Sequence, residues 1–157
     1  MDIQLMLALG RASAALGLGI AAIGSALGTG IAGMAAIGAW KKAYAQNRSA
    51  SFIIIAFIGA PLSQTIYGMI LMNIILGACE QAVSSGASFL DWPAMLASGL
   101  AGGLAMAFSS WYQGKAGAAA ADALGETGQG FGNYLITIGV VETVALFVMV
   151  FIQSTFQ

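Results

Sequence analysis

A single carboxylate, Glu142, lies in the middle of an apolar stretch that runs from Gly139 to Phe147. Placing an ionised glutamate near the centre of a bilayer costs about 2.5 kcal/mol or more, so such a residue usually binds an ion or moves a proton. The alternatives are a Glu that stays protonated and only donates a hydrogen bond between helices, and a stretch that is not a membrane span at all. We expect Glu142 to be the functional carboxylate.

Few other polar side chains lie deep in the apolar runs. Gln64 and Tyr67 are three residues apart and therefore share a helical face, with Ala60 one turn before Gln64. Pro61 lacks a backbone donor and disturbs the preceding turn, which makes the Ala60 carbonyl a candidate ligand. Hard cations prefer such oxygens. The candidate polar side chains are Ser63, Gln64, Thr65 and Tyr67, then Ser109, Ser110 and Gln113, and finally Glu142 and Thr143.

The two glutamines, Gln64 and Gln113, each have a second explanation. Amides in membrane helices commonly act as hydrogen-bonding glue between helices, at about 0.6 to 2 kcal/mol. Either glutamine alone fits both roles equally well. Together with Glu142 and the loosened turn at Pro61, they favour an ion site.

The composition is that of an integral membrane protein. Of the 157 residues, 59% are hydrophobic and 7% are charged, whereas soluble domains carry about a quarter charged residues. The chain has no His, which excludes His-based catalysis. Its formal net charge is −1, so it has no basic surface for nucleic acid. The single Cys79 is expected to be a packing residue, and the N-terminus lacks the basic segment of a cleaved signal, so we expect no cleavage.

Four apolar runs are long enough to cross a bilayer as helices, which needs about 20 residues each. They span residues 10–40, 51–79, 93–121 and 134–156. The predicted fold is therefore an all-α membrane protein with four transmembrane helices. Lys41, Lys42 and Arg48 lie in the first loop, and the positive-inside rule places that loop in the cytoplasm and both termini outside. Arg11 opposes this orientation weakly, and Lys115 can extend its stem from within the third helix.

The four helices alternate in character. The first and third are rich in glycine and alanine, as in the stretch from Gly24 to Gly28, whereas the second and fourth consist mainly of bulky residues. Small side chains let helices approach closely, so we expect the first and third helices inside an assembly and the other two outside it. The alternation also suggests two duplicated helical hairpins, residues 1–80 and 81–157, in which Gln64 aligns with Glu142.

Several motifs together resemble the proteolipid subunit of V-type rotary ATPases, and more narrowly subunit K of the bacterial, sodium-translocating type. They are Pro61 to Gly68, Gln113-Gly114-Lys115, Val141-Glu142-Thr143 and the stretch from Gly24 to Gly30. The resemblance covers essentially the whole chain. It implies a homo-oligomeric ring in the lipid bilayer that rotates against a stator, with one essential Glu in each protomer.

The resemblance also implies roles for individual residues. Glu142 is the essential carboxylate, the side chains of Gln64, Gln113 and Ser63 and the backbone oxygen of Ala60 are the other Na⁺ ligands, and the Tyr67 hydroxyl supports Glu142. About five oxygens suit a small hard cation, whereas a proton would need only the carboxylate and an acceptor. Leu62 and Thr65 stand where the family pattern has glycine.

The expected partners are a stator membrane subunit with an Arg that faces Glu142 and a central-stalk subunit at the cytoplasmic loops, in a bacterial plasma membrane. The chain has no phosphate-binding loop and is not expected to hydrolyse ATP itself. The nearest alternative is the same rotor translocating H⁺. A small independent transporter and a structural proteolipid are the others, although a transporter would more often show an inverted repeat.

Overall fold

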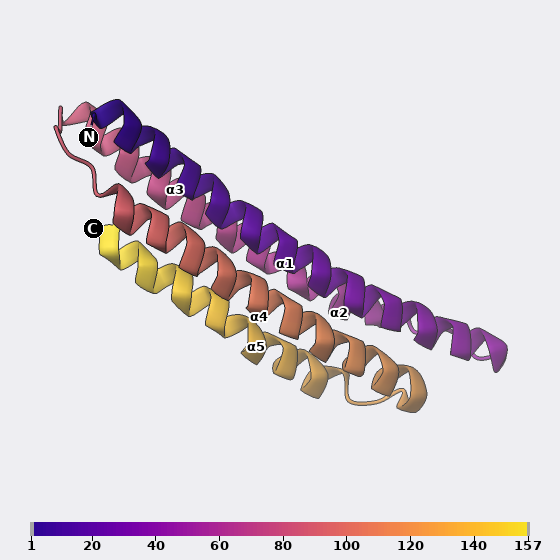
Figure 1. The fold of residues 1–157 in the computed structure, drawn as a ribbon. Helices are drawn as coiled ribbons and strands as arrows, with labels where there is room; N and C mark the ends of the chain where they lie inside the picture. The colour runs from indigo at the N-terminus through magenta and orange to yellow at the C-terminus, as the bar shows by residue number, and fades with distance from the viewer. Residues whose placement is uncertain (1, 157) are drawn as a thin grey trace.

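The computed structural model describes residues 2–156, and these fold into a bundle of long helices (Figure 1). The first span is α1 (Ile3–Ala45). The second is a continuous rod made of a 3₁₀ turn (Phe52–Ile54), α2 (Ile55–Gly59), a second 3₁₀ turn (Ala60–Leu62) and α3 (Ser63–Ser84). The third and fourth are α4 (Trp92–Thr127) and α5 (Phe131–Gln153), the latter followed by a 3₁₀ turn (Ser154–Phe156).

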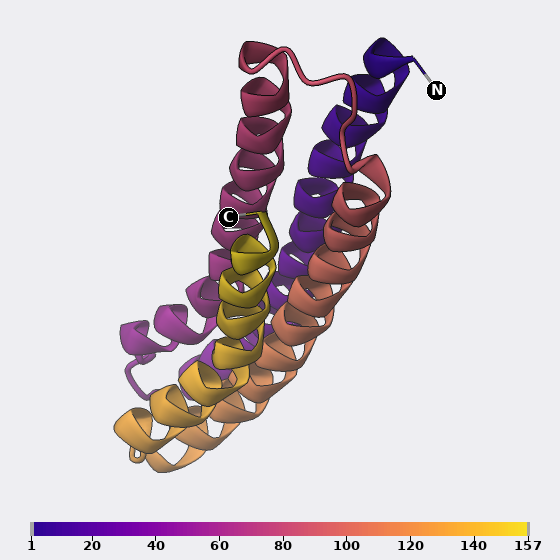
Figure 2. The same ribbon diagram turned by 90° about the vertical axis from the view of Figure 1, so that its left-hand side faces the viewer.

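Within residues 2–156, four helices are long and apolar enough to cross a membrane, which confirms the predicted fold class. The bundle is elongated and curved, and Figure 2 shows its rods bending along their length. Both chain ends lie at the end of the bundle that holds the connection from α3 to α4 (Figure 1). The other two connections lie at the opposite end, as an even number of spans requires.

The helices extend beyond the apolar runs. The first begins at Ile3 and the third continues to Thr127, because the sequence limits were drawn at changes of polarity rather than at hydrogen-bonded ends. The start of α4 is set by Asp91, whose Oδ1 accepts the backbone N–H of Ala94 at 3.3 Å. Its end is set by Gly128, at a φ of 68° that favours glycine.

The closest helix pair is α1 against α4. A methyl group added at Gly114 would overlap the backbone of Gly28, and one added at Gly24 would overlap the backbone of Ala107. Similarly, a methyl group at Gly99 would overlap the carbonyl of Ser13. The small residues of the first and third spans therefore pack against each other within one protomer.

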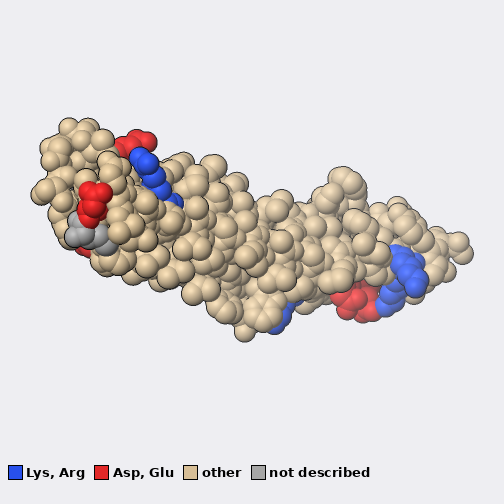
Figure 3. Space-filling view, turned by 45° about the horizontal axis from the view of Figure 1, so that its top comes forward, with Lys and Arg blue, Asp and Glu red and all other residues tan. Residues whose placement is uncertain are grey.

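The second and fourth spans present bulky apolar side chains outward. On α5, Ile136, Val140, Phe147 and Phe151 are more than half exposed. Figure 3 shows that charged side chains gather mainly toward the two ends of the molecule, with a broad uncharged surface between them. This surface suits a hydrocarbon environment.

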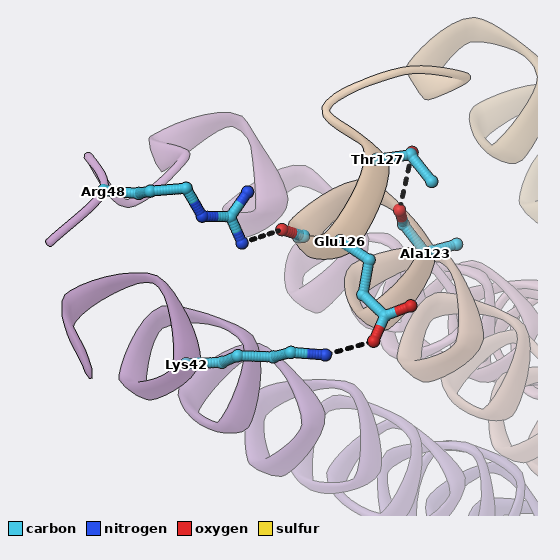
Figure 4. A network of polar contacts seen from close by, with 6 residues as sticks. Lys42, Arg48, Ala123, Glu126 and Thr127 are labelled. Atoms are coloured by element: carbon cyan, nitrogen blue, oxygen red, sulfur yellow. Dashed lines mark hydrogen bonds and ion pairs between the residues drawn. The ribbon is translucent and has the colours of Figure 1, made fainter. Parts of the chain in front are cut away.

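Polar contacts join α1 and α4 at the end that holds the first loop (Figure 4). The Lys42 ammonium pairs with the Glu126 carboxylate, and Arg48 Nη2 donates to the Gly125 carbonyl at 3.5 Å. The Trp40 indole N–H donates to the Ser51 carbonyl at 2.8 Å and so ties the loop to α1. These contacts hold the loop against the end of the third span.

Candidate functional site

Glu142 is the twelfth of the 23 residues of α5, so it lies at the middle of the fourth span. The Tyr67 hydroxyl from α3 donates to Glu142 Oε1 at 2.6 Å. The amide Nε2 of Gln113 from α4 donates to Glu142 Oε2 at 3.1 Å. Both carboxylate oxygens thus accept a hydrogen bond, each from a different neighbouring helix.

The hydrogen-bonded chain continues from Gln113 toward the second span. Gln64 Nε2 donates to Gln113 Oε1 at 2.9 Å. Ser63 Oγ lies 3.2 Å from Gln64 Oε1 and 3.0 Å from the Ala60 carbonyl oxygen, and it can donate to either. The structure therefore brings six groups into one cluster: the side chains of Ser63, Gln64, Tyr67, Gln113 and Glu142 and the Ala60 carbonyl.

The turn that contains Pro61 brings these groups together. Ala60, Pro61 and Leu62 form a 3₁₀ turn between α2 and α3, where Pro61 cannot donate to the carbonyl of the preceding turn. The Ala60 carbonyl accepts the backbone N–H of Ser63 and lies within hydrogen-bond distance of its hydroxyl. Ser110 Oγ from α4 donates to the Pro61 carbonyl at 2.8 Å, which fastens the irregular turn to the third span.

The cluster is secluded, although Glu142 reaches its edge. Gln64 and Gln113 are fully buried at 0% exposure, and Glu142 is half-buried. In residues 2–156 the only ion pair joins Lys42 to Glu126, far from this cluster in the bundle. An ionised Glu142 in a membrane therefore has hydrogen-bond donors among the described residues but no ion pair there, which favours a bound cation or a proton.

The oxygen set also limits the kind of cation. No group of three or more His, Cys, Asp or Glu side chains that could hold a metal occurs in the described part of the chain. The cluster offers one carboxylate together with neutral amide, hydroxyl and carbonyl oxygens. Such a set balances a single positive charge, and its oxygen atoms suit a hard ion.

Other polar residues of the apolar runs serve different roles. Ser109 Oγ donates to the Val141 carbonyl at 2.9 Å and joins α4 to α5 beside Glu142. Thr143 Oγ1 donates to the carbonyl of Val140 in its own helix and does not enter the cluster. One member was absent from the sequence prediction: the Ile138 carbonyl accepts from Gln113 Nε2 at 3.3 Å. No side-chain signal could have identified a backbone oxygen on a regular helix.

Comparison with known proteins points to one class of membrane protein. Residues 96–152, which include Gln113 and Glu142, match the family model for the C subunit of ATP synthase. The chain is also 35% identical over 141 residues to a protein named A-type ATP synthase subunit K from Methanocaldococcus jannaschii. That alignment covers 90% of the chain, and the chain spans 58% of the length of the relative.

The match to the family model covers most of the α4–α5 hairpin, the half of the chain that carries Glu142. The similarity to subunit K extends over both hairpins. In its second hairpin the chain is thus similar to the C-subunit family of ATP synthases, and over nearly its whole length it is similar to an A-type subunit K.

Proposed function

We propose that the chain is a proteolipid subunit of the rotor ring of a rotary ATPase of the A/V type and that it carries Na⁺ across the membrane on Glu142. The observation that carries this proposal is the position of Glu142, at mid-span with both carboxylate oxygens held by Tyr67 and Gln113. The similarity to ATP synthase proteolipids in both comparisons supports it. The protomer itself would not hydrolyse ATP, which is the task of other subunits.

In this mechanism the cation travels with the ring. Its charge neutralises Glu142 while the protomer faces lipid, and the hydrogen bond from Tyr67 keeps the carboxylate turned into the cluster. At the stator, an Arg of the membrane subunit would face the unloaded carboxylate and favour release. The loops at the far end of the bundle, including Lys41 to Ser49, would contact the central stalk in the cytoplasm.

The same rotor translocating H⁺ is the second candidate, and Glu142 alone could carry the proton. A buried amide in hydrocarbon costs free energy unless it finds hydrogen-bond partners, and a proton site does not require two of them. Na⁺ explains their presence, because Gln64 and Gln113 can supply neutral oxygens beside Glu142, Ser63 and the Ala60 carbonyl. Protons and Na⁺ should then compete for one site.

Carbodiimide labelling of Glu142 in purified rings tests the proposal, because the reagent modifies a protonated, accessible carboxyl group. Millimolar Na⁺ at constant pH should slow the labelling, and K⁺ at the same concentration should slow it much less. If Na⁺ leaves the labelling rate unchanged from about pH 6 to pH 9, the coupling ion is the proton and the sodium proposal is wrong.

Two variants make this test specific. Gln113→Leu should weaken the protection by Na⁺, because it removes one ligand and one donor to Glu142. Gln81→Leu, at an exposed position near the end of α3, is the matched control. In this variant Na⁺ should protect Glu142 as strongly as in the parent chain. A structural proteolipid would tolerate Glu142→Gln without loss of ion transport by the assembled ATPase, and that result would contradict the proposed function.

A further inference from the structure

Ser25, on α1, has an unusual side chain. It is 2% exposed, and its Oγ is the one buried side-chain nitrogen or oxygen atom in residues 2–156 that lacks a hydrogen-bond partner. Other hydroxyls on these helices donate to a carbonyl one turn back, as Ser13 does to Gly10 at 2.7 Å and Thr29 does to Ser25 at 2.7 Å. A buried hydroxyl without a partner is costly in an apolar setting and calls for an explanation.

The register between α1 and the second span shows what Ser25 faces. A methyl group added at Gly68 would meet the side chain of Ala21, and one added at Gly28 would meet the side chain of Pro61. These two pairs define an antiparallel alignment. Ser25 lies four residues after Ala21 and three before Gly28.

The residue opposite Ser25 follows from the same alignment. Gln64 lies four residues before Gly68 and three after Pro61, which places it opposite Ser25. Gln64 is itself fully buried. The unpartnered hydroxyl therefore stands across the helix interface from a member of the candidate ion site, on a helix that contributes nothing else to it.

The present hydrogen bonds of Gln64 show why a further acceptor is needed. Its Nε2 donates to Gln113 Oε1, and its Oε1 lies 3.2 Å from Ser63 Oγ, which can donate to it. Gln113 Oε1 is also a proposed ligand, and an amide N–H that points at it repels a cation bound there, so loading of the site favours a rotation of the Gln64 amide that breaks this hydrogen bond. Such a rotation would keep Oε1 beside the ion and direct Nε2 toward α1.

After that rotation, Nε2 of Gln64 needs an acceptor other than Gln113 and Ser63. The Ser63 hydroxyl oxygen and the Ala60 carbonyl are themselves proposed ligands of the ion. A serine hydroxyl has two lone pairs, and it can also donate its proton to a carbonyl of its own helix. Ser25 Oγ is the available acceptor.

We propose that Ser25 is a positioning residue of the ion site: its hydroxyl accepts the amide N–H of Gln64 when Gln113 and Gln64 bind Na⁺ through their oxygens. The inference rests on the proposed function. Ser25 does not touch the ion, and it acts by making the ligating orientation of Gln64 the favourable one when the site is loaded. Loading and unloading would then be accompanied by an exchange of partners between Gln113 and Ser25.

The experiment measures protection of Glu142 from carbodiimide by Na⁺ in assembled rings. Loss of one neutral hydrogen bond in Ser25→Ala should raise the half-protecting Na⁺ concentration roughly three- to tenfold. Thr29→Ala, one turn further along α1, removes a hydroxyl that bonds only within its own helix and should leave that concentration unchanged. Ring yield is measured for each variant, and Ser25→Ala should assemble normally because the removed hydroxyl has no partner in the structure.

A double-mutant cycle separates positioning from general packing. In the Gln64→Leu background the affinity is already reduced, and adding Ser25→Ala should have no further effect, because the hydroxyl acts only through the Gln64 amide. An equal additional loss in that background would overturn the proposal, as would a half-protecting concentration for Ser25→Ala equal to that of the parent. If the parent ring shows no protection by Na⁺ at all, the proposed function fails and this inference fails with it.

Discussion

The hydroxyl of Tyr67 forms the shortest contact to Glu142 in the cluster, at 2.6 Å. Hydrogen bonds to a charged acceptor contribute about 1.5 to 3 kcal/mol, roughly twice as much as neutral ones. Tyr67 belongs to the second span, so this bond also ties the fourth span to the second across the site. This hydrogen bond therefore both fixes the orientation of the Glu142 carboxylate and connects two helices.

Tyr67→Phe should accordingly weaken the closed form of Glu142. We expect the half-protecting Na⁺ concentration in the carbodiimide assay to rise roughly tenfold to one hundredfold, in line with the loss of one charge-assisted bond. Tyr112→Phe removes a hydroxyl from an exposed tyrosine on α4 and is the control. Equal protection in both variants would show that Tyr67 does not hold the carboxylate.

At the scale of single residues, the sequence identified the members of the cluster but not their connections. Glu142, Gln64 and Gln113 were conspicuous because a polar side chain in an apolar run has few structural uses. The order of donors and acceptors could not be read in advance, since an amide can present either its oxygen or its nitrogen. The Ile138 carbonyl and the Ser25 hydroxyl entered only through helix packing.

Among the elements, α1 and α4 are the most closely packed pair. Their glycines allow the two backbones to approach so closely that an added methyl group at several positions would overlap the opposite backbone. The second and fourth spans pack around this pair, and their polar groups meet at the site.

Gly28→Leu should prevent the protomer from folding, and with it any ring. The added side chain would overlap the Ser110 carbonyl and the Pro61 side chain, and overpacking of this kind costs about 1 to 3 kcal/mol or more. Gly30→Leu, where nothing in the protomer lies within 4 Å, should leave the protomer folded. Circular dichroism and the yield of monodisperse protein in detergent measure both effects, and a normal yield for Gly28→Leu would contradict the packing described.

The N-terminal end of α4 offers a second test at this scale. Asp91→Ala removes the side chain that accepts the Ala94 N–H, and we expect a loss of about 1 kcal/mol in the free energy of unfolding. Asp91→Asn should retain most of that stability, because an amide oxygen can also cap a helix. Thermal unfolding in detergent compares the two, with Asp122→Ala as an exposed control; identical transitions for all three would argue against the cap.

At the scale of the whole molecule, both chain ends lie on the same side as the α3–α4 connection (Figure 1). This arrangement follows from the even number of spans. The orientation in the membrane is a prediction from the positive charges of the first loop. It matters for the proposed function, in which a central stalk would contact the loop end that carries Lys41 and Lys42. Among the described residues, Lys42 pairs with Glu126, whereas Lys41 and Arg48 at the same end form no ion pair.

Single cysteines test that orientation. In a Cys79→Ala background, cysteines at Gln46 and at Ser85 should react with membrane-impermeant reagents from opposite sides, with Gln46 labelled only from the cytoplasm. The native Cys79 is buried, but it is replaced so that its thiol cannot react when the protein unfolds locally. Labelling of both positions from the same side would rule out the predicted topology.

The sequence alone determined the class of the protein and the number of its spans, and it named the side chains that meet around Glu142. Those features depend on composition and on the high cost of polar groups in hydrocarbon, and both are local properties of the chain. Tertiary structure decided which glycine faces which backbone, the direction of each hydrogen bond around Glu142 and the place of Ser25 opposite Gln64. These depend on the register between helices, which follows from the packing of many small side chains at once and is not marked by any single residue.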